Sequence, residues 1–504
     1  MDFDAISSAI NLLTSSGSAW LVLVPGILIG LIFSAIPGLT ISIAMAVFLP
    51  STFYMDFLSS LIFLTAIYTG GAFGSAIPAI LFNMPGQPAA TATAFDGFPM
   101  TQQGRHNEAL GLGLMASVVG TLFGYLVLAF TIEPIGRFVL KLGPTEMLIV
   151  AIWGLTLIAG LHGGSFARGF LAGTFGLLLG TIGLSSRGDV RGTMDIVWLL
   201  DGIPTVPALM GAFAISELFN LMHRLHIVEN QEQRKLDLPK IVDGMLRGLR
   251  KPWSLVRGSA IGVLIGAIPG VGGSVANLVS YAQARRQSDN PDSFGSGNPE
   301  GVIAAESANS GSEAGSMATL LALGLPGGGG TAVMLGAFAM HNITGGPRFL
   351  HDQKDIVYAV IFSNFIQGIA LLVLGLGFVW IASAIVKVPI RLLVPIVIVL
   401  AIFGSYSLEG NISGPVTLLI FSALGWVMRR YGYSVAALII GLLLGRMTEG
   451  SLLRTYQLGG GELDFLLTRP IALVLMALLI VSLFLPVIMR RLRRSRPGFL
   501  PGSE

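Results

Sequence analysis

The stretch Gly26-Ile-Leu-Ile-Gly30, followed closely by Ala35-Ile36-Pro37-Gly38, occurs twice in this chain. The second copy is Gly258-Ser-Ala-Ile-Gly262 with Ala267-Ile268-Pro269-Gly270, and it aligns with the first at a constant offset of 232 positions (258 − 26). Both copies lie in apolar segments, and each places a helix-breaking Pro-Gly where a membrane helix would otherwise continue. Hydrophobic segments that are interrupted at corresponding places in two halves are typical of the binding sites of transporters.

The composition is that of a membrane protein. Charged residues make up 11% of the chain, against about 25% in soluble proteins, and 53% of the residues are hydrophobic. With a mean hydropathy of +0.78, the chain is predicted to be an all-α polytopic membrane protein. The absence of cysteine excludes disulfides, thiolate metal sites and cysteine nucleophiles. The net charge of +3 gives no argument for nucleic-acid binding, because the basic residues cluster in short loops and in the tail.

The distribution of apolar segments predicts about 11–13 membrane-embedded elements, some of them too short or too long for a simple span. The longest polar stretch, 222–257, is rich in Lys and Arg and is therefore predicted to be cytoplasmic. Apolar residues of this stretch share one helical face, which is typical of an interfacial helix on the membrane or of an ordinary linker helix. These residues are Ile241, Val242, Met245, Leu246 and Leu249.

The basic pair Arg429-Arg430 and the tail from Arg490 to Arg496 are predicted to lie on the same side as this linker. The chain then divides into five regions. They are a first transmembrane repeat (1–221), the cytoplasmic linker (222–257), a second transmembrane repeat (258–446), an external loop with an extra transmembrane helix (447–489) and a basic cytoplasmic tail (490–504).

On this assignment the first repeat starts outside and ends at the cytoplasmic linker, whereas the second starts at the linker and ends outside. The two halves are then inverted relative to each other in the membrane, with broken or re-entrant helices in each. The alternative is a parallel repeat, which follows from hydropathy when the charges are ignored.

The repeat extends to a second Pro-Gly in each half, at an offset of 241 positions (311 − 70). The matched positions are Gly70 with Gly311, Gly74-Ser75 with Gly315-Ser316, and Pro85-Gly86 with Pro326-Gly327. Four breaks result, and the residues at and beside them are the predicted substrate-binding positions. These are Pro37, Gly38, Thr40, Pro85, Gly86, Pro269, Gly270, Gly272, Gly273, Ser274, Asn277, Pro326, Gly327, Gly328, Gly329 and Thr331.

The breaks suit the binding of a charged solute. Unwound backbone is tolerated at membrane depth only where protein or a water-filled cavity surrounds it. A half-helix that begins after Pro-Gly directs unpaired N–H groups and a positive dipole end at that cavity, which favours a carboxylate or phosphate. The carbonyl ends of half-helices favour a cation instead. The alternative is that the glycines serve close helix packing.

The segment 301–325 combines acidic and small polar residues with an apolar stretch. Glu306 and Glu313 are seven positions apart, so on a helix they share a face. Together with Asn309 and Ser310 they are the predicted ion-coupling residues, as a proton relay or facing a sodium ion, because acidic groups within a membrane are costly and usually functional. The alternative is an aqueous hairpin outside the lipid.

Catalytic and nucleotide-binding motifs are not found in the sequence. There is no zinc-ligand spacing and no Ser-His-Asp context, and the run Gly327–Gly330 lacks the Lys-Ser/Thr of a phosphate-binding P-loop. No cofactor and no metal are therefore expected, and the energy for transport is expected to come from a sodium or proton gradient.

Several motifs of the chain are distinctive. They are Tyr68-Thr-Gly-Gly71, Ala94-Phe-Asp96-Gly97-Phe-Pro99-Met100, Gly104-Arg105, Leu323-Gly-Leu-Pro326-Gly327, Leu335-Gly336-Ala337 and Leu443-Leu444-Gly445 with Glu449. Together with the paired breaks, these motifs resemble the large membrane subunit of the tripartite tricarboxylate transporters, from about residue 18 to about residue 455.

The resemblance implies a secondary active transporter of the bacterial inner membrane, embedded in lipid, which takes up carboxylates such as citrate with sodium or protons. It also implies a small integral membrane subunit and a periplasmic solute-binding protein as partners. Two stretches, 307–313 and 327–330, depart from the family pattern and leave the substrate and the ion open. The alternatives are a stand-alone anion channel or exporter and an intramembrane enzyme, for which no convergent acid, base or nucleophile is found.

Overall fold

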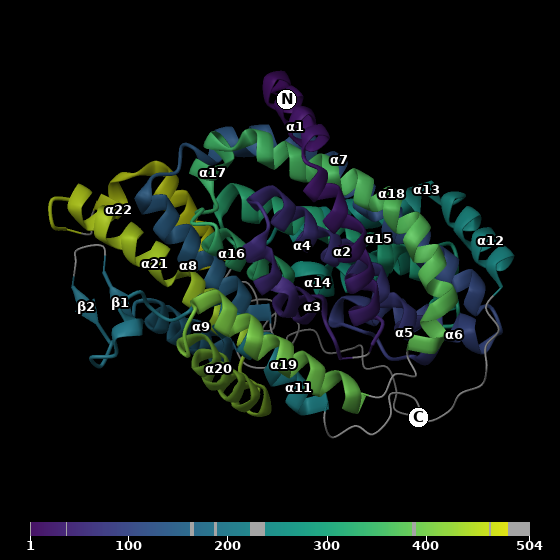
Figure 1. Ribbon diagram of the computed structural model, residues 1–504. Helices are drawn as coiled ribbons and strands as arrows, with labels where there is room; N and C mark the ends of the chain where they lie inside the picture. The colour runs from purple at the N-terminus through teal and green to yellow at the C-terminus, as the bar shows by residue number, and fades with distance from the viewer. Residues whose placement is uncertain are drawn as a thin grey trace, which may run out of the picture.

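The structure, a computed structural model, is built almost entirely of α-helices (Figure 1). It describes residues 2–36, 38–161, 166–185, 189–221, 237–385, 390–462 and 465–481. Among these, five helices are long and apolar enough to cross a membrane, and shorter apolar helices accompany them. The prediction of an all-α polytopic membrane protein is confirmed.

The first half of the chain contains the first two breaks and the long helix α7. Its elements are α1 (Phe3–Ser15), α2 (Gly17–Ser34), α3 (Ile41–Phe48), η1 (Leu49–Tyr54), α4 (Phe57–Gly74), α5 (Ala76–Phe82), η2 (Pro88–Ala90), α6 (Thr91–Gln102), α7 (His106–Val139), α8 (Pro144–Leu161), α9 (Phe166–Gly180), β1 (Gly183–Leu184), β2 (Val190–Arg191), η3 (Val197–Leu199), α10 (Thr205–Leu209), the π-helical η4 (Met210–Ile215) and α11 (Ser216–Leu221). The strands β1 and β2 form a small antiparallel sheet in which Gly183 is opposite Arg191.

The second half contains the third and fourth breaks. Its elements are α12 (Leu238–Leu249), α13 (Pro252–Gly266), α14 (Gly272–Gln287), η5 (Pro291–Ser293), α15 (Pro299–Leu323), α16 (Gly329–Met340), α17 (Pro347–Asp352), α18 (Lys354–Ile385), α19 (Ile390–Glu409), α20 (Ser413–Arg430), α21 (Val435–Leu458) and α22 (Phe465–Thr468), followed by an apolar helix over Pro470–Val481.

Each predicted break separates two helices in the structure. In the first half, α2 ends before the first Pro-Gly and α3 begins after it, with the Thr40 hydroxyl as N-cap; Gly38 has a positive φ of 93°. The second break follows α5, where Asn83 has a left-handed conformation with φ of 56°. A positive φ is costly for most side chains, which explains glycine at the first of these turns.

The second half has breaks of the same kind. The turn between α13 and α14 contains Gly270 and Gly272, both with positive φ. The helix α15 ends at Gly324, a left-handed C-cap, and α16 begins at Gly329 after the fourth Pro-Gly. The sequence therefore located all four interruptions of the helices correctly.

Glycines allow two equivalent helix pairs to pack closely. Gly30 of α2 lies against Ile67 of α4, and a Cβ at Gly30 would overlap the Ile67 carbonyl oxygen. Gly262 of α13 lies in the same way against the carbonyl oxygen of Ala308 in α15. Small residues permit this close approach of membrane helices. Part of the repeated glycine pattern therefore serves packing.

The helices at equivalent places in the two halves run in opposite directions. Thr69 of α4 contacts Glu313 of α15, whereas Ala72, further along α4, contacts Asn309, which comes earlier in α15. The long helices α7 and α18 also cross with opposed directions. Such opposition is what an inverted repeat requires.

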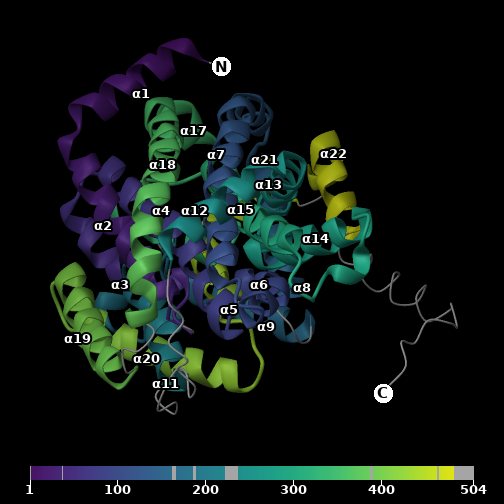
Figure 2. The same ribbon diagram turned by 90° about the vertical axis from the view of Figure 1, so that its right-hand side faces the viewer.

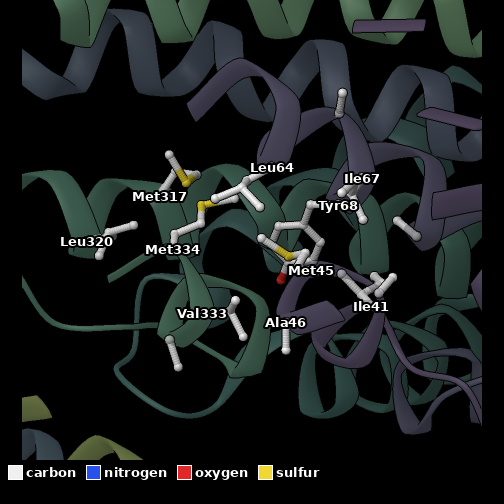
Figure 3. Packing of buried hydrophobic residues seen from close by; sticks show 14 of the residues in the cluster. Ile41, Met45, Ala46, Leu64, Ile67, Tyr68, Met317, Leu320, Val333 and Met334 are labelled. Carbon is white, nitrogen blue, oxygen red and sulfur yellow. The ribbon is translucent and has the colours of Figure 1, made fainter. Parts of the chain in front are cut away.

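The interior of the molecule lies where broken helices from both halves meet. Figure 3 shows Ile41 and Met45 of α3 packed beside Tyr68 of α4, with Met334 of α16 on the other side. Around this centre, α8 and α9 pack on α21, while α19 and α20 pack near η4 and α11 (Figures 1 and 2). The breaks are therefore held in a protein interior.

Three details differ from the sequence predictions or decide between them. The segment 301–325 is no aqueous hairpin: α15 is one continuous helix, and its residues 301–322 are buried. Of the predicted linker, 222–257, residues 222–236 lie outside the described residues. The helix α13 begins at Pro252, before the predicted end of the linker. The helix α21 continues through residue 446 to Leu458, where the sequence predicted an external loop.

The apolar face of α12, which the sequence predicts to be interfacial, is partly buried and partly exposed. Ile241 and Met245 are buried, and a Cβ at Gly244 would overlap the carbonyl of Glu108 in α7. Leu246 and Leu249 are about half exposed. The helix thus packs on α7 with one side and presents an apolar edge on the other.

Candidate functional site

A cavity of about 780 Å³ lies where the four breaks meet. Residues from each break line it, so that segments more than 200 positions apart in the sequence contribute to one site. The predicted residues that line the cavity are Gly38, Thr40, Pro85, Gly86, Gly270, Gly272, Gly273, Ser274, Asn309, Gly328 and Gly329. Its size is in the range of about 300–1,000 Å³ that is usual for small-molecule sites.

Three helices begin at the wall of this cavity. The first residues of α3, α14 and α16 all line it. The N-terminus of α3 is capped by Thr40, which accepts a hydrogen bond from the Ile43 amide, whereas α14 and α16 have no side-chain cap. Helix N-termini present N–H groups and a partial positive charge. The cavity wall is thus suited to an anion.

Two glycines leave the backbone of this wall without side chains. A Cβ at Gly328 would meet no atom nearer than 3.6 Å, and that atom is the Cα of Gly272 across the cavity. Gly272 itself has a φ of 58° and similarly open surroundings. At these two positions the absence of a side chain leaves room beside the backbone rather than allowing helix packing.

Several predicted residues support the breaks without lining the cavity. They are Pro269, Asn277, Pro326, Gly327 and Thr331, while Pro37 lies outside the described residues. The Pro326 carbonyl accepts a hydrogen bond from the Gly270 amide, which ties the third break to the fourth. The Thr331 hydroxyl bonds the Gly328 backbone.

Gly327 and Asn277 are two predicted positions that lie beside the cavity without lining it. A Cβ at Gly327 would lie 2.6 Å from the Cα of Ser316, so this glycine is needed for packing against α15. The Asn277 side chain is buried; it accepts from the Ala92 amide at 2.8 Å and donates to the Ala305 carbonyl at 3.1 Å. Both residues face protein because the local sequence does not reveal which side of a turn faces the cavity.

The sequence analysis missed a part of the wall that comes from α20, α21 and η4. The lining residues from these elements are Arg429, the segment 432–436, Ile440 and Phe213. From the sequence, Arg429 serves only to orient the chain in the membrane. The signal that could have pointed to a site is the basic pair Arg429-Arg430 at the end of a helix. Tyr68 and Ser42 were also missed, because they lie within helices beside the breaks.

Arg429 gives the cavity a charge. Among the described residues that line it, Arg429 is the only one with a formal charge. Its Nε donates to the Ser216 hydroxyl at 3.2 Å, which holds the guanidinium at the end of α20. A guanidinium recognises carboxylates with several donors in one plane.

The carboxyl group of Glu306 is fully buried between α6, α7 and α15. It accepts hydrogen bonds from the hydroxyls of Thr93 and Ser117, the latter at 3.2 Å. Thr93 in turn accepts from the Asn277 amide at 3.4 Å. The described part of the chain places no cationic side chain within ion-pair distance of Glu306, although buried carboxylates are usually paired.

Glu313 is fully buried two helical turns further along α15. The Thr69 hydroxyl lies 3.1 Å from both of its carboxyl oxygens, and the Tyr125 hydroxyl donates at 2.9 Å. The Thr69 hydroxyl also lies 3.3 Å from the Gln367 carbonyl oxygen. None of the described cationic side chains forms an ion pair with Glu313 either.

The other two ion-coupling candidates differ in their position. Asn309 lines the cavity, and its amide donates to the Ala72 carbonyl at 3.2 Å. Ser310 is fully buried away from the cavity, and its hydroxyl has no hydrogen-bond partner among the residues that the structure describes. The structure therefore connects Asn309 with the cavity and separates Ser310 from it.

Asp96, in the distinctive Asp-Gly-x-Pro-Met stretch, orders the loop between α14 and α15. Its Oδ1 accepts from the backbone amides of Gly295, Gly297 and Asn298 at 2.8–2.9 Å, and its Oδ2 accepts from the Tyr281 hydroxyl. A buried carboxylate with four donors is well satisfied. The motif therefore has a structural explanation.

A metal site is not formed by the described side chains: no group of three or more His, Asp or Glu residues among them could hold a metal ion. The chemistry of the site is that of backbone amides, hydroxyls, one guanidinium and two buried carboxyl groups.

Residues 20–440 match the family described as the Tripartite tricarboxylate transporter TctA family. An "Uncharacterized 52.8 kDa protein in TAR-I ttuC' 3'region" of Agrobacterium vitis is 31% identical over 458 residues, which is 90% of each chain. An "Uncharacterized protein in TAR-II ttuC' 3'region" of the same organism is 33% identical over 227 residues, covering 45% of this chain and 94% of that protein. No solved structure matches the chain.

Proposed function

Because the chain belongs to the tripartite tricarboxylate transporter TctA family, we propose that it takes up an organic carboxylate together with a coupling cation. The substrate would resemble a tricarboxylate or dicarboxylate and would be delivered by a periplasmic solute-binding protein. The family is a transporter component and not an enzyme.

The observation that carries the proposal is the convergence of four broken helices on one cavity. Amide-rich helix ends in a space of about 780 Å³ favour a small anion over a neutral or cationic solute. The N-termini of α14 and α16 offer uncapped amides, and Arg429 of α20 also lines the cavity. Backbone amides together with a guanidinium suit a substrate that carries more than one carboxylate.

The binding positions that we propose are the predicted residues that line this cavity, with Gly272, Ser274 and Gly328 nearest to the uncapped helix ends. The substrate carboxylates would accept hydrogen bonds from the backbone amides and from Ser274, and the bare glycines would let the carboxylates approach the backbone. Pro269, Pro326 and Thr331 would support the breaks from behind.

The coupling cation is proposed to act at α15. This helix brings Glu306, Asn309, Ser310 and Glu313 into the interior, and Asn309 among them lines the cavity. A buried carboxyl group that lacks a cationic partner either holds a proton or binds a cation. Its occupancy can therefore depend on an ion gradient.

We propose that the two halves form an inverted repeat and that access to the cavity alternates between the two sides of the membrane. The opposed directions of α4 and α15 support the inverted arrangement over the parallel alternative. The repeats would comprise residues 1–221 and 258–446, joined by the cytoplasmic linker 222–257. Residues 447–489 and the basic tail 490–504 would follow the second repeat.

The partners proposed are a small integral membrane subunit and a periplasmic solute-binding protein, and the location is the bacterial inner membrane, where lipid surrounds the apolar helices. The family name supports a system of several components. Five apolar helices of spanning length support a multi-pass protein. Nucleic acid is not expected as a partner.

Uptake by reconstituted protein tests the proposal. The chain would be reconstituted in vesicles with its small membrane subunit and binding protein, and the uptake of labelled citrate, succinate and an uncharged control sugar would be followed under separate sodium and pH gradients. Accumulation of a carboxylate that needs both a gradient and the binding protein is expected.

The same assay separates the alternative. A stand-alone channel or exporter would pass carboxylate without the binding protein, and its flux would stop at equal concentrations on both sides. Flux of that kind, or equal uptake of the sugar, would contradict the proposed function.

A further inference from the structure

The network around Glu313 contains one hydrogen-bond acceptor too many for an ionised carboxylate. Glu313 meets the hydroxyls of Thr69 and Tyr125, and the Thr69 hydroxyl also meets the Gln367 carbonyl oxygen. Two hydroxyl hydrogens then serve three acceptor atoms, which are the two Glu313 oxygens and the Gln367 oxygen. A hydroxyl has one hydrogen to donate, so one acceptor stays unpaired.

The orientation of Gln367 follows from the partners of its amide group. Its nitrogen donates to the Thr65 hydroxyl at 2.9 Å and lies 3.4 Å from the Ile62 carbonyl, whereas a reversed amide would set its oxygen against that carbonyl oxygen. The oxygen is therefore assigned to the side of Thr69. Thr65 itself donates to the Ile62 carbonyl at 3.1 Å. The hydrogen bonds on the far side of Gln367 are therefore already assigned.

One additional proton completes the network without moving an atom. If Glu313 is protonated, it donates to the Thr69 oxygen, Thr69 donates to the Gln367 oxygen, and Tyr125 donates to the remaining Glu313 oxygen. Every separation in this chain is between 2.9 and 3.3 Å, which is the range of hydrogen bonds. An unpaired buried acceptor would cost free energy, so the protonated form fits this site.

From this network we infer that Glu313 is the residue that binds the coupling proton during carboxylate uptake. The inference rests on the proposed function and selects one acid of the two and one ion of the two. In the step itself, a hydronium ion in the cavity gives its proton to one Glu313 oxygen and becomes water, and the carboxylate becomes neutral. The same O–H bond breaks when water on the other side takes up the proton.

Glu306 provides the contrast. Its carboxyl oxygens meet two hydroxyls, Thr93 and Ser117, and Thr93 receives a hydrogen from Asn277, so that its own hydrogen is free for Glu306. Donors and acceptors balance there with an ionised carboxylate. Identical residues on one helix thus have different requirements, because their partners on other helices differ.

Glu313 is close to the cavity although it is not part of the wall. Tyr68, which lines the cavity, directly precedes Thr69 in α4, and the Thr69 hydroxyl contacts Glu313. Asn309, also in the wall, lies one helical turn before Glu313 on α15. Movement of the substrate against Tyr68 and Asn309 can therefore change the surroundings of Glu313.

The titratable groups that face Glu313 are Tyr125 of α7 and Tyr68 of α4. The remaining titratable side chains of the elements packed on α15 are bonded elsewhere or lie near the ends of their helices. They are Arg257 of α13, Tyr281, Arg285 and Arg286 of α14, Asp96 of α6, Arg348, His351 and Asp352 of α17, His106, Glu108, Glu133 and Arg137 of α7, and Glu300 and Glu306 of α15 itself. On α18, which supplies Gln367, they are Lys354, Asp355 and Tyr358 near its start.

Glu313→Gln tests the inference, because glutamine supplies the hydrogen of the protonated acid permanently. The complex with its membrane subunit and binding protein would be reconstituted with labelled citrate and, in parallel, labelled succinate. We expect Glu313→Gln to keep exchange of labelled for unlabelled substrate within about threefold of the unmodified protein. We also expect it to lose all accumulation driven by an acidic exterior. The matched control Glu300→Gln, at the start of the same helix and ion-paired with Lys251, should keep that response.

Infrared difference spectra provide a second readout that does not need a transporting variant. The unmodified protein at neutral pH should have the carbonyl band of a buried protonated carboxylic acid, and this band should be absent from Glu313→Gln and present in Glu306→Gln. Absence of the band from the unmodified protein would overturn the inference even if Glu313→Gln failed to fold.

The outcomes separate the inference from the proposed function. A pH response in Glu313→Gln that equals that of the unmodified protein, or accumulation by the unmodified protein that follows sodium alone, would overturn the proton at Glu313 and leave carboxylate uptake standing. Absence of any citrate or succinate exchange by the unmodified protein would overturn both.

Discussion

The broken-helix pairs of the two halves share a backbone arrangement but differ in chemistry. In both, glycines of the first helix pack on the second, through Gly30 in one half and Gly262 in the other. Their central helices differ: α4 carries hydroxyl groups, and α15 carries the two buried acids. At the offset of 241, Asn309 corresponds to Tyr68, and both residues line the cavity.

The comparison shows how helices with a similar backbone arrangement can carry different chemistry. Tyr68 and Asn309 line one cavity, and α15 meets α4 with opposed direction. The acids of the second half then find their hydrogen-bond donors on helices of the first half, such as Thr69 and Tyr125. The two halves share the backbone arrangement, whereas the residues in which they differ supply the acidic groups.

The largest expected effect comes from the shared part of the comparison. Gly30→Val and Gly262→Val would each drive a side chain into the backbone of the neighbouring helix. Overpacking costs about 1–3 kcal/mol and more where backbone must move, so both variants should lose most of the folded protein. Thermal unfolding in detergent would measure this. If only one of the two is destabilised, the two pairs are not equivalent.

A second substitution makes the cavity more symmetric. Gly328 corresponds to Gln87 at the offset of 241, and its extended backbone accepts any residue. Gly328→Gln should fold normally, because the added atoms enter the cavity, and should reduce carboxylate uptake roughly 100-fold by displacing the substrate.

The matched control for this variant is the neighbouring glycine. Gly327→Ala should lower the melting temperature, because its Cβ would lie 2.6 Å from the Cα of Ser316. Unchanged uptake by Gly328→Gln in a folded protein would show that the substrate does not occupy this part of the cavity.

The third prediction concerns the cation of the cavity, which also comes from the second half. Arg429→Gln removes the guanidinium from the cavity lining, and hydrogen bonds to charged groups contribute about 1.5–3 kcal/mol. KM for the transported carboxylate should rise about tenfold or more. Arg429→Lys should recover part of the loss, since it restores the charge without the planar donors. An equal KM in all three proteins would remove Arg429 from the binding site.

The smallest effect is expected at the starts of α4 and α15, where the two halves use different caps. Asp56 accepts from the Ser59 amide at 2.9 Å, and Asn298 accepts from the Glu300 amide at 2.8 Å. Replacing either by Ala should lower the free energy of unfolding by about 1 kcal/mol. Thermal melts of both variants would measure this.

Only the Asp56 cap should depend on pH. Burial raises the pKa of Asp56, but hydrogen bonds from the Ser59 hydroxyl and amide and from Ser18 outweigh it, so the pKa lies below its ordinary value. A depressed pKa gives stability above the pKa of the unfolded chain, and this stability is lost as pH falls through the folded value. The Asp56→Ala difference should therefore shrink in acid, while that of Asn298→Ala stays constant. A constant Asp56 difference would contradict this.

Much of the fold followed from residues that act locally. Pro-Gly interrupts a helix wherever it stands, so the four breaks could be predicted, and the low charge content identified the membrane class. The site was predicted less completely. Gly327 and Gly328 are neighbours of the same type, yet one packs on Ser316 and the other faces the cavity. Arg429 could not be assigned to the site, because it lies far from all four breaks in the sequence.

The sequence by itself determined the class of the protein and the places where its helices stop, because hydropathy and backbone conformation depend on a residue and its immediate neighbours. Only the tertiary structure decided which glycines pack and which line the cavity, and that Glu313 meets Thr69 and Gln367 while Glu306 meets Thr93. Those properties depend on the atoms that other helices place around a residue, and these helices lie up to a few hundred positions away in the chain.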